Sequence, residues 1–231
     1  MITLPIAKSG NKITLAPSKI IAIGLNYLDH IKERVVKESN IPAEPIVFAK
    51  TPNSLVESGS PIVFPAILND YTFEEPRTDL EAELAVIISK RGRNIPKEKA
   101  YEYVLGYTCF NDVSQRNIQR SDPAGWFRGK SFDTFSPIGP VVVLHADIGD
   151  PQKLRICSRI NGEVKQDGNT CDMIFSIPVL ISYISRNFTL EEGDIIATGT
   201  PAGVSPIKPG DNVEIEIEGI GILHNTVVME S

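Results

Sequence analysis

The chain has 231 residues, 42% of them hydrophobic, which is enough apolar material for one globular domain with a substantial core. Its formal net charge of -6 argues against a nucleic-acid or anionic-membrane partner, since either would favour a basic surface. The N-terminus lacks the charged and apolar regions of a signal peptide, and no apolar run is long enough to cross a bilayer, so we expect a cytoplasmic protein without a membrane partner.

Short β-branched runs separated by glycine and proline predict a strand-rich chain with few helices. We expect an N-terminal strand segment in residues 1–16 and one compact unit in residues 17–231. Within that unit, the runs that predict strands are 20–25, 45–50, 60–65, 82–88, 139–144, 194–199 and 213–221. Helical spacing occurs at 26–37, 97–104, 112–121 and 176–185, and Pro178 interrupts the last of these near its start. These helices would flank the sheets.

The run at 213–221 alternates between glutamates and aliphatic residues. Its outward residues are expected to be Glu214, Glu216 and Glu218, and its inward residues Val213, Ile215 and Ile217. This alternation is typical of an edge or surface strand in a sandwich or barrel. We therefore expect the glutamates of this run to be solvated.

The cysteines indicate neither a disulfide framework nor a zinc cluster. There are three of them, Cys109, Cys157 and Cys171, which is an odd number without CxxC spacing. We expect them to be ordinary buried or half-buried thiols.

Residues 80–88, LEAELAVII, place two glutamates inside a run that otherwise predicts a buried strand. Strand alternation sends Glu81 and Glu83 to one face, with Asp79 ahead of them on the same side. Buried carboxylates are costly unless a cation neutralises them, and a divalent metal ion would do so. The alternatives are a solvated strand face or a pairing with Arg77.

Asp112 is the third candidate carboxylate. It follows the apolar run 107–110 and precedes a predicted helix, so it lies at a strand end. Taken alone it would more often be the N-cap of that helix. Together with Glu81 and Glu83 it forms an oxygen-only set, which Mg²⁺ or Mn²⁺ prefers and Zn²⁺ does not. Such a set leaves coordination positions for water and substrate.

His30 and Glu33 form a second constellation, at positions i and i+3. On a helix they point the same way, and a carboxylate bonded to one imidazole nitrogen makes the other a better base. The pair could then activate water. In the alternative interpretation, Glu33 pairs with Lys37 and His30 is simply exposed.

Several motifs in order resemble the fumarylacetoacetate hydrolase family, in its branch of acylpyruvases and 2-hydroxyhepta-2,4-diene-1,7-dioate isomerases. The motifs are IGLNYLDHIKE (23–33), VFAKTPNSL (47–55), LEAELAVII (80–88), NDVSQRNIQ (111–119), GKSFDTFSPIGP (129–140) and GDIIATGTPAGV (193–204). One departure is the stretch 68–79, which is longer and more charged than the family pattern and could alter the entrance to the site.

The resemblance implies a role for each motif. Glu81, Glu83 and Asp112 would bind Mg²⁺ or Mn²⁺, and Lys130 would stabilise an oxyanion on the substrate. The segment with His30 and Glu33 would be a lid that delivers the base. The residues expected to contact substrate are Arg116, Gln119, Thr200, Asn26 and Tyr27, and Trp126 with Phe127 could form an apolar wall. Without the resemblance, Lys130 would be interpreted as a solvated lysine, and Arg116 with Gln119 as an exposed pair on one helix face.

The implied fold is α+β and β-rich, a rolled or barrel-like mixed sheet with short flanking helices and the metal at its mouth. The family also implies a homodimer.

The implied substrate is a small 2-oxo acid that reacts through a metal-stabilised enolate. We expect carbon–carbon hydrolysis of an acylpyruvate, such as fumarylpyruvate or acetylpyruvate. The alternatives are oxaloacetate decarboxylation and isomerisation or tautomerisation of a 2-hydroxy-dienedioate, as in aromatic catabolism. Outside enzymes, the alternative is an inactive family member that binds a metal or metabolite. The presence of His30, Glu33, Lys130 and all three metal carboxylates argues against that alternative.

Overall fold

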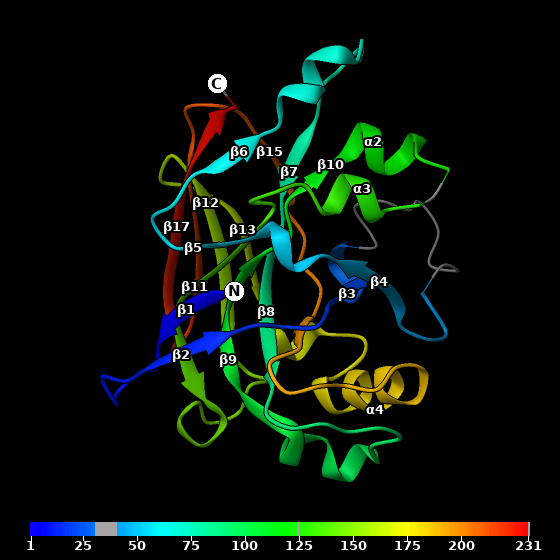
Figure 1. The fold of residues 1–231 in the computed structure, drawn as a ribbon, viewed down its shortest axis with the longest axis vertical. Helices are drawn as coiled ribbons and strands as arrows, with labels where there is room; N and C mark the ends of the chain where they lie inside the picture. Colours follow the sequence, from blue (N-terminus) through cyan, green and yellow to red (C-terminus); the bar gives the residue numbers. More distant parts are fainter. Residues whose placement is uncertain (31–40, 124, 231) are drawn as a thin grey trace.

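A seven-stranded mixed sheet lies at the centre of the protein, in a computed structural model that describes residues 1–30, 41–123 and 125–230 (Figure 1). Its strand order is β4 (Ile46–Lys50), β3 (Ile20–Gly24), β14 (Ile195–Ala197), β8 (Ala82–Ile88), β9 (Val104–Asn111), β11 (Ser136–Leu144) and β5 (Leu55–Glu57). Every residue of β8 is buried, because this strand is central and covered on both faces.

A five-stranded sheet packs against one face of the seven-stranded sheet. Its order is β13 (Glu163–Asn169), β12 (Arg155–Ile160), β16 (Asn212–Ile217), β17 (Gly221–Met229) and β6 (Ile62–Phe64). The largest apolar cluster lies between the two sheets and includes Leu84, Val86, Tyr107, Ile156 and Ile215. Along β16 the aliphatic residues are buried and the glutamates half-buried, which confirms the predicted alternation. The strand lies inside its sheet, so it is a surface strand and not an edge strand.

A three-stranded sheet places the first carboxylates. Its order is β10 (Ser114–Gln115), β7 (Thr78–Leu80) and β15 (Ser205–Ile207). Because β7 ends at Leu80 and β8 begins at Ala82, the chain passes from one sheet into the other at Glu81. A glutamate at this junction lies where two sheets meet.

The helices are short, as the sequence predicts. They are α2 (Arg116–Ser121), α3 (Phe127–Lys130), α4 (Ile177–Asn187), and the 3-10 helices η2 (Pro52–Ser54), η3 (Ala66–Asp70), η4 (Lys97–Tyr103), η5 (His145–Asp147) and η6 (Thr170–Asp172). Pro178 does not interrupt α4, because it lies in the first turn, where its missing N–H removes no helical hydrogen bond. The helix expected at 112–121 begins only at Arg116, since β10 comes first. Residues 31–37 of the helix expected at 26–37 lie outside the described residues.

The first residues form a hairpin of β1 (Ile2–Pro5) and β2 (Lys12–Leu15). Ile2, Leu4 and Leu15 cover a second apolar cluster on the other face of the seven-stranded sheet. The boundary between residues 16 and 17 stays a prediction. The β-rich α+β class with a rolled mixed sheet is confirmed. Among the described residues, none of the helices is long and apolar enough to span a membrane.

The three cysteines are free, and we expect only one to react in the folded protein. Cys109 and Cys157 are buried, and burial raises the pKa of the Cys109 thiol to about 12, so its thiolate is scarce at neutral pH. Cys171 is exposed. A thiol reagent should therefore modify one cysteine per chain natively and all three after denaturation, as counted by mass spectrometry. Cys171→Ser should abolish native labelling, and label found on Cys109 would contradict the predicted burial.

Candidate active site

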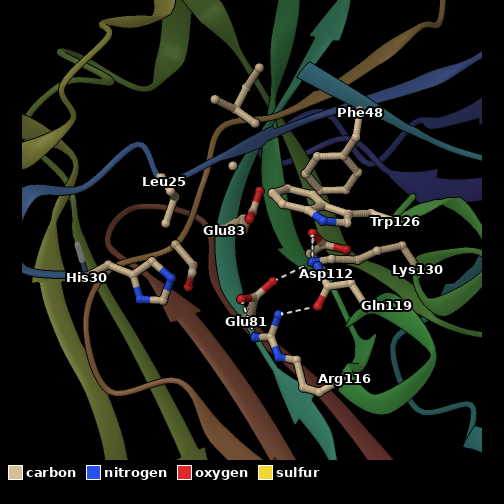
Figure 2. A pocket seen from close by; sticks show the side chains of 13 residues that line it. Leu25, His30, Phe48, Glu81, Glu83, Asp112, Arg116, Gln119, Trp126 and Lys130 are labelled. Atoms are coloured by element: carbon tan, nitrogen blue, oxygen red, sulfur yellow. Dashed lines mark hydrogen bonds and ion pairs between the residues drawn. The ribbon is translucent and has the colours of Figure 1, made fainter. Parts of the chain in front are cut away.

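A cavity opens where β8, the end of β9, α2, α3 and the loop after β14 meet (Figure 2). Its walls carry most of the residues that the sequence singles out. They are His30, Glu81, Glu83, Asp112, Arg116, Gln119, Trp126, Lys130 and Thr200, together with Ile23, Gly24, Leu25 and Phe48.

The three predicted carboxylates lie together in this cavity. One ligand oxygen from each of Glu81, Glu83 and Asp112 lies within 4.8 Å of the others, and all three residues are buried. Strand pairing explains the arrangement, because Ala82 lies opposite Asn111 in the β8–β9 ladder and the Asp112 N–H donates to the Glu81 carbonyl at 2.9 Å. Asp112 is not the helix cap, since Gln115 caps α2 through its side chain.

Two buried lysines neutralise Asp112. Lys130 Nζ lies 2.5 Å from Asp112 Oδ2 and 2.5 Å from Glu81 Oε2. Lys50 Nζ lies 2.6 Å from Asp112 Oδ1 and donates to the Phe135 carbonyl at 2.9 Å. Burial lowers the pKa of Lys50 to about 8, although Asp112 opposes that shift. The sequence analysis assigned no role to Lys50, although this lysine closes the apolar strand 46–50 and lies in the motif VFAKTPNSL (47–55).

Arg116 holds Glu81 from the other side. Its guanidinium donates to Asp79 Oδ2 at 2.7 Å, to Glu81 Oε1 at 2.5 Å and to Gln119 Oε1 at 2.9 Å. Although burial opposes it, the positive charges of Arg116 and Lys130 hold the pKa of Glu81 well below its usual range. Arg77 pairs with Asp79 alone, at 2.8 Å. Arg116 and Gln119 share a face as predicted, and Arg116 is already occupied by two carboxylates.

Glu83 differs from its two neighbours, because no lysine or arginine among the described residues forms an ion pair with it. It accepts a hydrogen bond from the Gly199 N–H at 2.9 Å. Burial, followed by the charges of Asp112 and Glu81, raises the pKa of Glu83 well above its usual range. A third carboxylate held here without a cation fits a site built for a divalent ion with oxygen ligands.

The loop after β14 depends on Gly199 and Asn26. Gly199 has φ of +97°, and a Cβ there would lie 2.7 Å from Asn26 Cβ, so only glycine fits without movement. The Asn26 amide donates to the carbonyls of Thr198 at 2.8 Å and Phe175 at 3.1 Å. Asn26 thus braces the loop and does not line the cavity. Tyr27 packs in the apolar core and does not line the cavity either. The substrate contacts of Asn26 and Tyr27 stay predictions.

His30 is 3% exposed and lines the cavity on the side opposite Lys130 and Arg116 (Figure 2). Glu33, its predicted partner, lies outside the described residues. Trp126 forms part of an aromatic wall with Phe48, at a ring-centroid distance of 5.2 Å, whereas Phe127 is exposed. No residue of the stretch 68–79 lines the cavity.

Comparison with known proteins matches residues 19–228 to the family described as fumarylacetoacetate (FAA) hydrolase C-terminal. The oxaloacetate tautomerase YisK of Bacillus subtilis is 44% identical over 219 residues, which cover 91% of this chain and 70% of that protein. The 5-carboxymethyl-2-hydroxymuconate delta-isomerase of Mycobacterium smegmatis has a similar structure, with a TM-score of 0.83 and 36% identity over 96% of this chain and 87% of that one.

A third similar protein is the fumarylpyruvate hydrolase of Pseudomonas aeruginosa, in complex with Mn²⁺ and pyruvate. It has a TM-score of 0.85 and 31% identity, and the match covers 99% of this chain and 96% of that one. The two solved structures thus share the fold of this chain, and the three proteins are named for different reactions.

Proposed function

The chain belongs to the fumarylacetoacetate hydrolase family, whose members are enzymes, and we propose that it is a divalent-metal-dependent enzyme acting on a small 2-oxo acid. The observation that supports this proposal is the buried set of Glu81, Glu83 and Asp112. Within the described residues, no lysine or arginine forms an ion pair with Glu83. These three residues would hold Mg²⁺ or Mn²⁺.

We propose keto–enol tautomerisation of oxaloacetate as the leading reaction. The relative at 44% identity is an oxaloacetate tautomerase, whereas the hydrolase in complex with Mn²⁺ and pyruvate is 31% identical. Tautomerisation needs one proton moved between C3 and the 2-oxo oxygen and no attacking water. Tautomerisation therefore needs fewer catalytic side chains than acylpyruvate hydrolysis, which the sequence favoured. Hydrolysis would also require Glu33 to complete the water-activating pair with His30.

The chain's own residues supply the proton and charge chemistry. A divalent ion at the three carboxylates would withdraw electrons from the carboxylate and 2-oxo oxygens of the substrate and so favour its enolate form. Lys130 would donate a hydrogen bond to the 2-oxo oxygen as negative charge develops there. His30, across the cavity, would exchange the proton at C3. Trp126 and Phe48 would exclude water from the reacting carbon.

Acylpyruvate hydrolysis is the second candidate, supported by the TM-score of 0.85 to the fumarylpyruvate hydrolase. One experiment separates the candidates: purified protein with Mn²⁺, or with excess EDTA, is mixed with enol-oxaloacetate and separately with acetylpyruvate. Metal-dependent acceleration of the loss of enol absorbance, without pyruvate release, would support the tautomerase. Pyruvate release from acetylpyruvate would favour the hydrolase, and pyruvate release from oxaloacetate a decarboxylase. No metal-dependent change with either substrate would contradict the proposal and favour an isomerase or a binding protein.

We expect His30→Ala to slow tautomerisation by roughly 100-fold or more, because it removes the proposed proton carrier at C3. Mn²⁺ affinity, measured by calorimetry, should stay unchanged, since His30 is not among the three carboxylates. His224→Ala is the matched control, because His224 lies on β17 and does not line the cavity. Equal activity of the two variants would exclude His30 from the reaction. The homodimer and the cytoplasmic location stay predictions.

A further inference from the structure

Gln166 is a fully buried amide behind the cavity wall, and it does not line the cavity itself. Its Oε1 accepts from the Ala82 N–H at 3.0 Å and from Ser158 Oγ at 3.0 Å. Its Nε2 donates to Thr200 Oγ1 at 2.7 Å and to the Pro201 carbonyl at 2.8 Å. All four hydrogen-bonding positions of this side chain are therefore used.

The partners of Gln166 fix the orientation of its amide. A backbone N–H can only donate and a carbonyl can only accept, so Oε1 must face Ala82 and Nε2 must face Pro201. A flipped amide would place two donors together at Ala82 and two acceptors together at Pro201. Nε2 consequently donates to Thr200 Oγ1, and the Thr200 hydroxyl must accept that bond.

This constraint determines what Thr200 can offer a ligand. Because its oxygen accepts from Gln166, its own O–H proton must point elsewhere, and no acceptor for it is found among the described residues. Thr200 lines the cavity and is 5% exposed. Its hydroxyl proton is thus available for donation to a ligand in the cavity.

The same amide also holds the strand that carries two of the carboxylates. Ala82 lies between Glu81 and Glu83, and its N–H is held by Gln166. The loop that carries Thr200 packs closely on β13, since a Cβ at Gly203 would lie 2.0 Å from the Lys165 carbonyl oxygen. Gln166 therefore links the strand that carries two carboxylates to the loop that carries the donor.

We propose that Gln166 is a positioning residue that presents the Thr200 hydroxyl as a donor to the carboxylate of the bound 2-oxo acid. This inference rests on the proposed function, because it assumes an anionic substrate beside the three metal carboxylates. A glutamate at position 166 would fit the same space but would reverse the direction of the hydrogen bond with Thr200. Its second oxygen would accept the Thr200 proton and leave only lone pairs facing the substrate carboxylate.

The test compares Gln166→Met, Gln166→Glu, Thr200→Val, Thr200→Ser and the double variant Q166M/T200V. KM and kcat for oxaloacetate are measured beside Mn²⁺ affinity and thermal stability. We expect Q166M and T200V each to raise KM roughly tenfold, the effect of one hydrogen bond to a charged group, with a smaller change in kcat. The Q166E variant should raise KM further, and T200S, which keeps a hydroxyl at this position, should reverse most of the rise in KM that T200V causes.

The double variant decides the question. If Gln166 acts through Thr200, Q166M should add little to the KM of T200V. A multiplied effect in the double variant, or an unchanged KM in Q166M, would overturn the proposal. Because Q166M also loses the bond to Ala82, its Mn²⁺ affinity and melting temperature show how much of any change is structural.

Binding of oxalate to the Mn²⁺-loaded protein, measured by calorimetry, gives a readout that does not need turnover. If the parent protein binds oxalate but does not convert oxaloacetate, the proposed reaction fails, and oxalate affinity in the same variants still tests Gln166. If the Mn²⁺-loaded parent does not bind oxalate, the 2-oxo acid site and the role of Gln166 both fail.

Discussion

Lys50→Met is expected to destabilise the metal-free protein by about 3 kcal/mol, the lower end of the cost of breaking a buried ion pair. The Lys50 ammonium is fully buried, and its loss removes this donor from Asp112 Oδ1, whereas the Phe135 carbonyl still accepts from the Val113 N–H at 3.2 Å. Lys130 still neutralises Asp112 Oδ2, which keeps the cost from being larger. For a chain of this length the melting temperature should fall by roughly 10 °C in scanning calorimetry.

Two further variants identify the cause of that loss. Lys153→Met is the matched control, because the Lys153 side chain is 76% exposed and its removal should change the melting temperature little. The double variant K50M/D112N should recover much of the lost stability, because it removes the uncompensated charge as well. If K50M/D112N melts no higher than K50M, lost packing and not the ion pair is responsible.

The carboxylate cluster was predictable from sequence because its geometry follows from strand alternation. Glu81 and Glu83 are two residues apart on one strand, and Asp112 ends the neighbouring strand, so pairing of β8 with β9 brings them together. Lys50 was not predictable from the same reasoning, since it lies on β4, which is not adjacent to either strand. Only the three-dimensional arrangement shows a lysine at the end of an apolar strand to be the partner of Asp112.

The fold shows the same limit. Runs such as 82–88 and 139–144 were recognised as strands because continuous β-branched sequence is typical of buried strands. Strands with mixed composition, such as β13 with the sequence EVKQDGN, gave no such signal. They are strands because their neighbours pair with them. Gln166 lies on that unrecognised strand, so its link to Thr200 could not be inferred from the sequence.

Glu83→Gln is expected to lower Mn²⁺ affinity by roughly 100-fold or more, because it removes one of the three proposed metal ligands, and even residues that support a metal ligand are worth 10- to 100-fold. The metal-free protein should be as stable as the parent or more stable by about 1 kcal/mol. Glutamine can still accept from the Gly199 N–H, and it avoids both the burial of a charge and the repulsion from Asp112 and Glu81, which together raise the pKa of Glu83. Metal binding and stability should therefore change in opposite directions.

The two effects can be read in one set of melting curves recorded with and without Mn²⁺. At a Mn²⁺ concentration 100 times its Kd, the parent protein should gain about 2.7 kcal/mol, and a variant with 100-fold weaker affinity only about 0.4 kcal/mol. Glu98→Gln is the matched control, because Glu98 is exposed on η4 and should keep the full gain. If E83Q keeps the parent's Mn²⁺-dependent stabilisation, the metal binds away from these carboxylates. If metal-free E83Q is less stable than the parent, Glu83 contributes to the fold as a charged group.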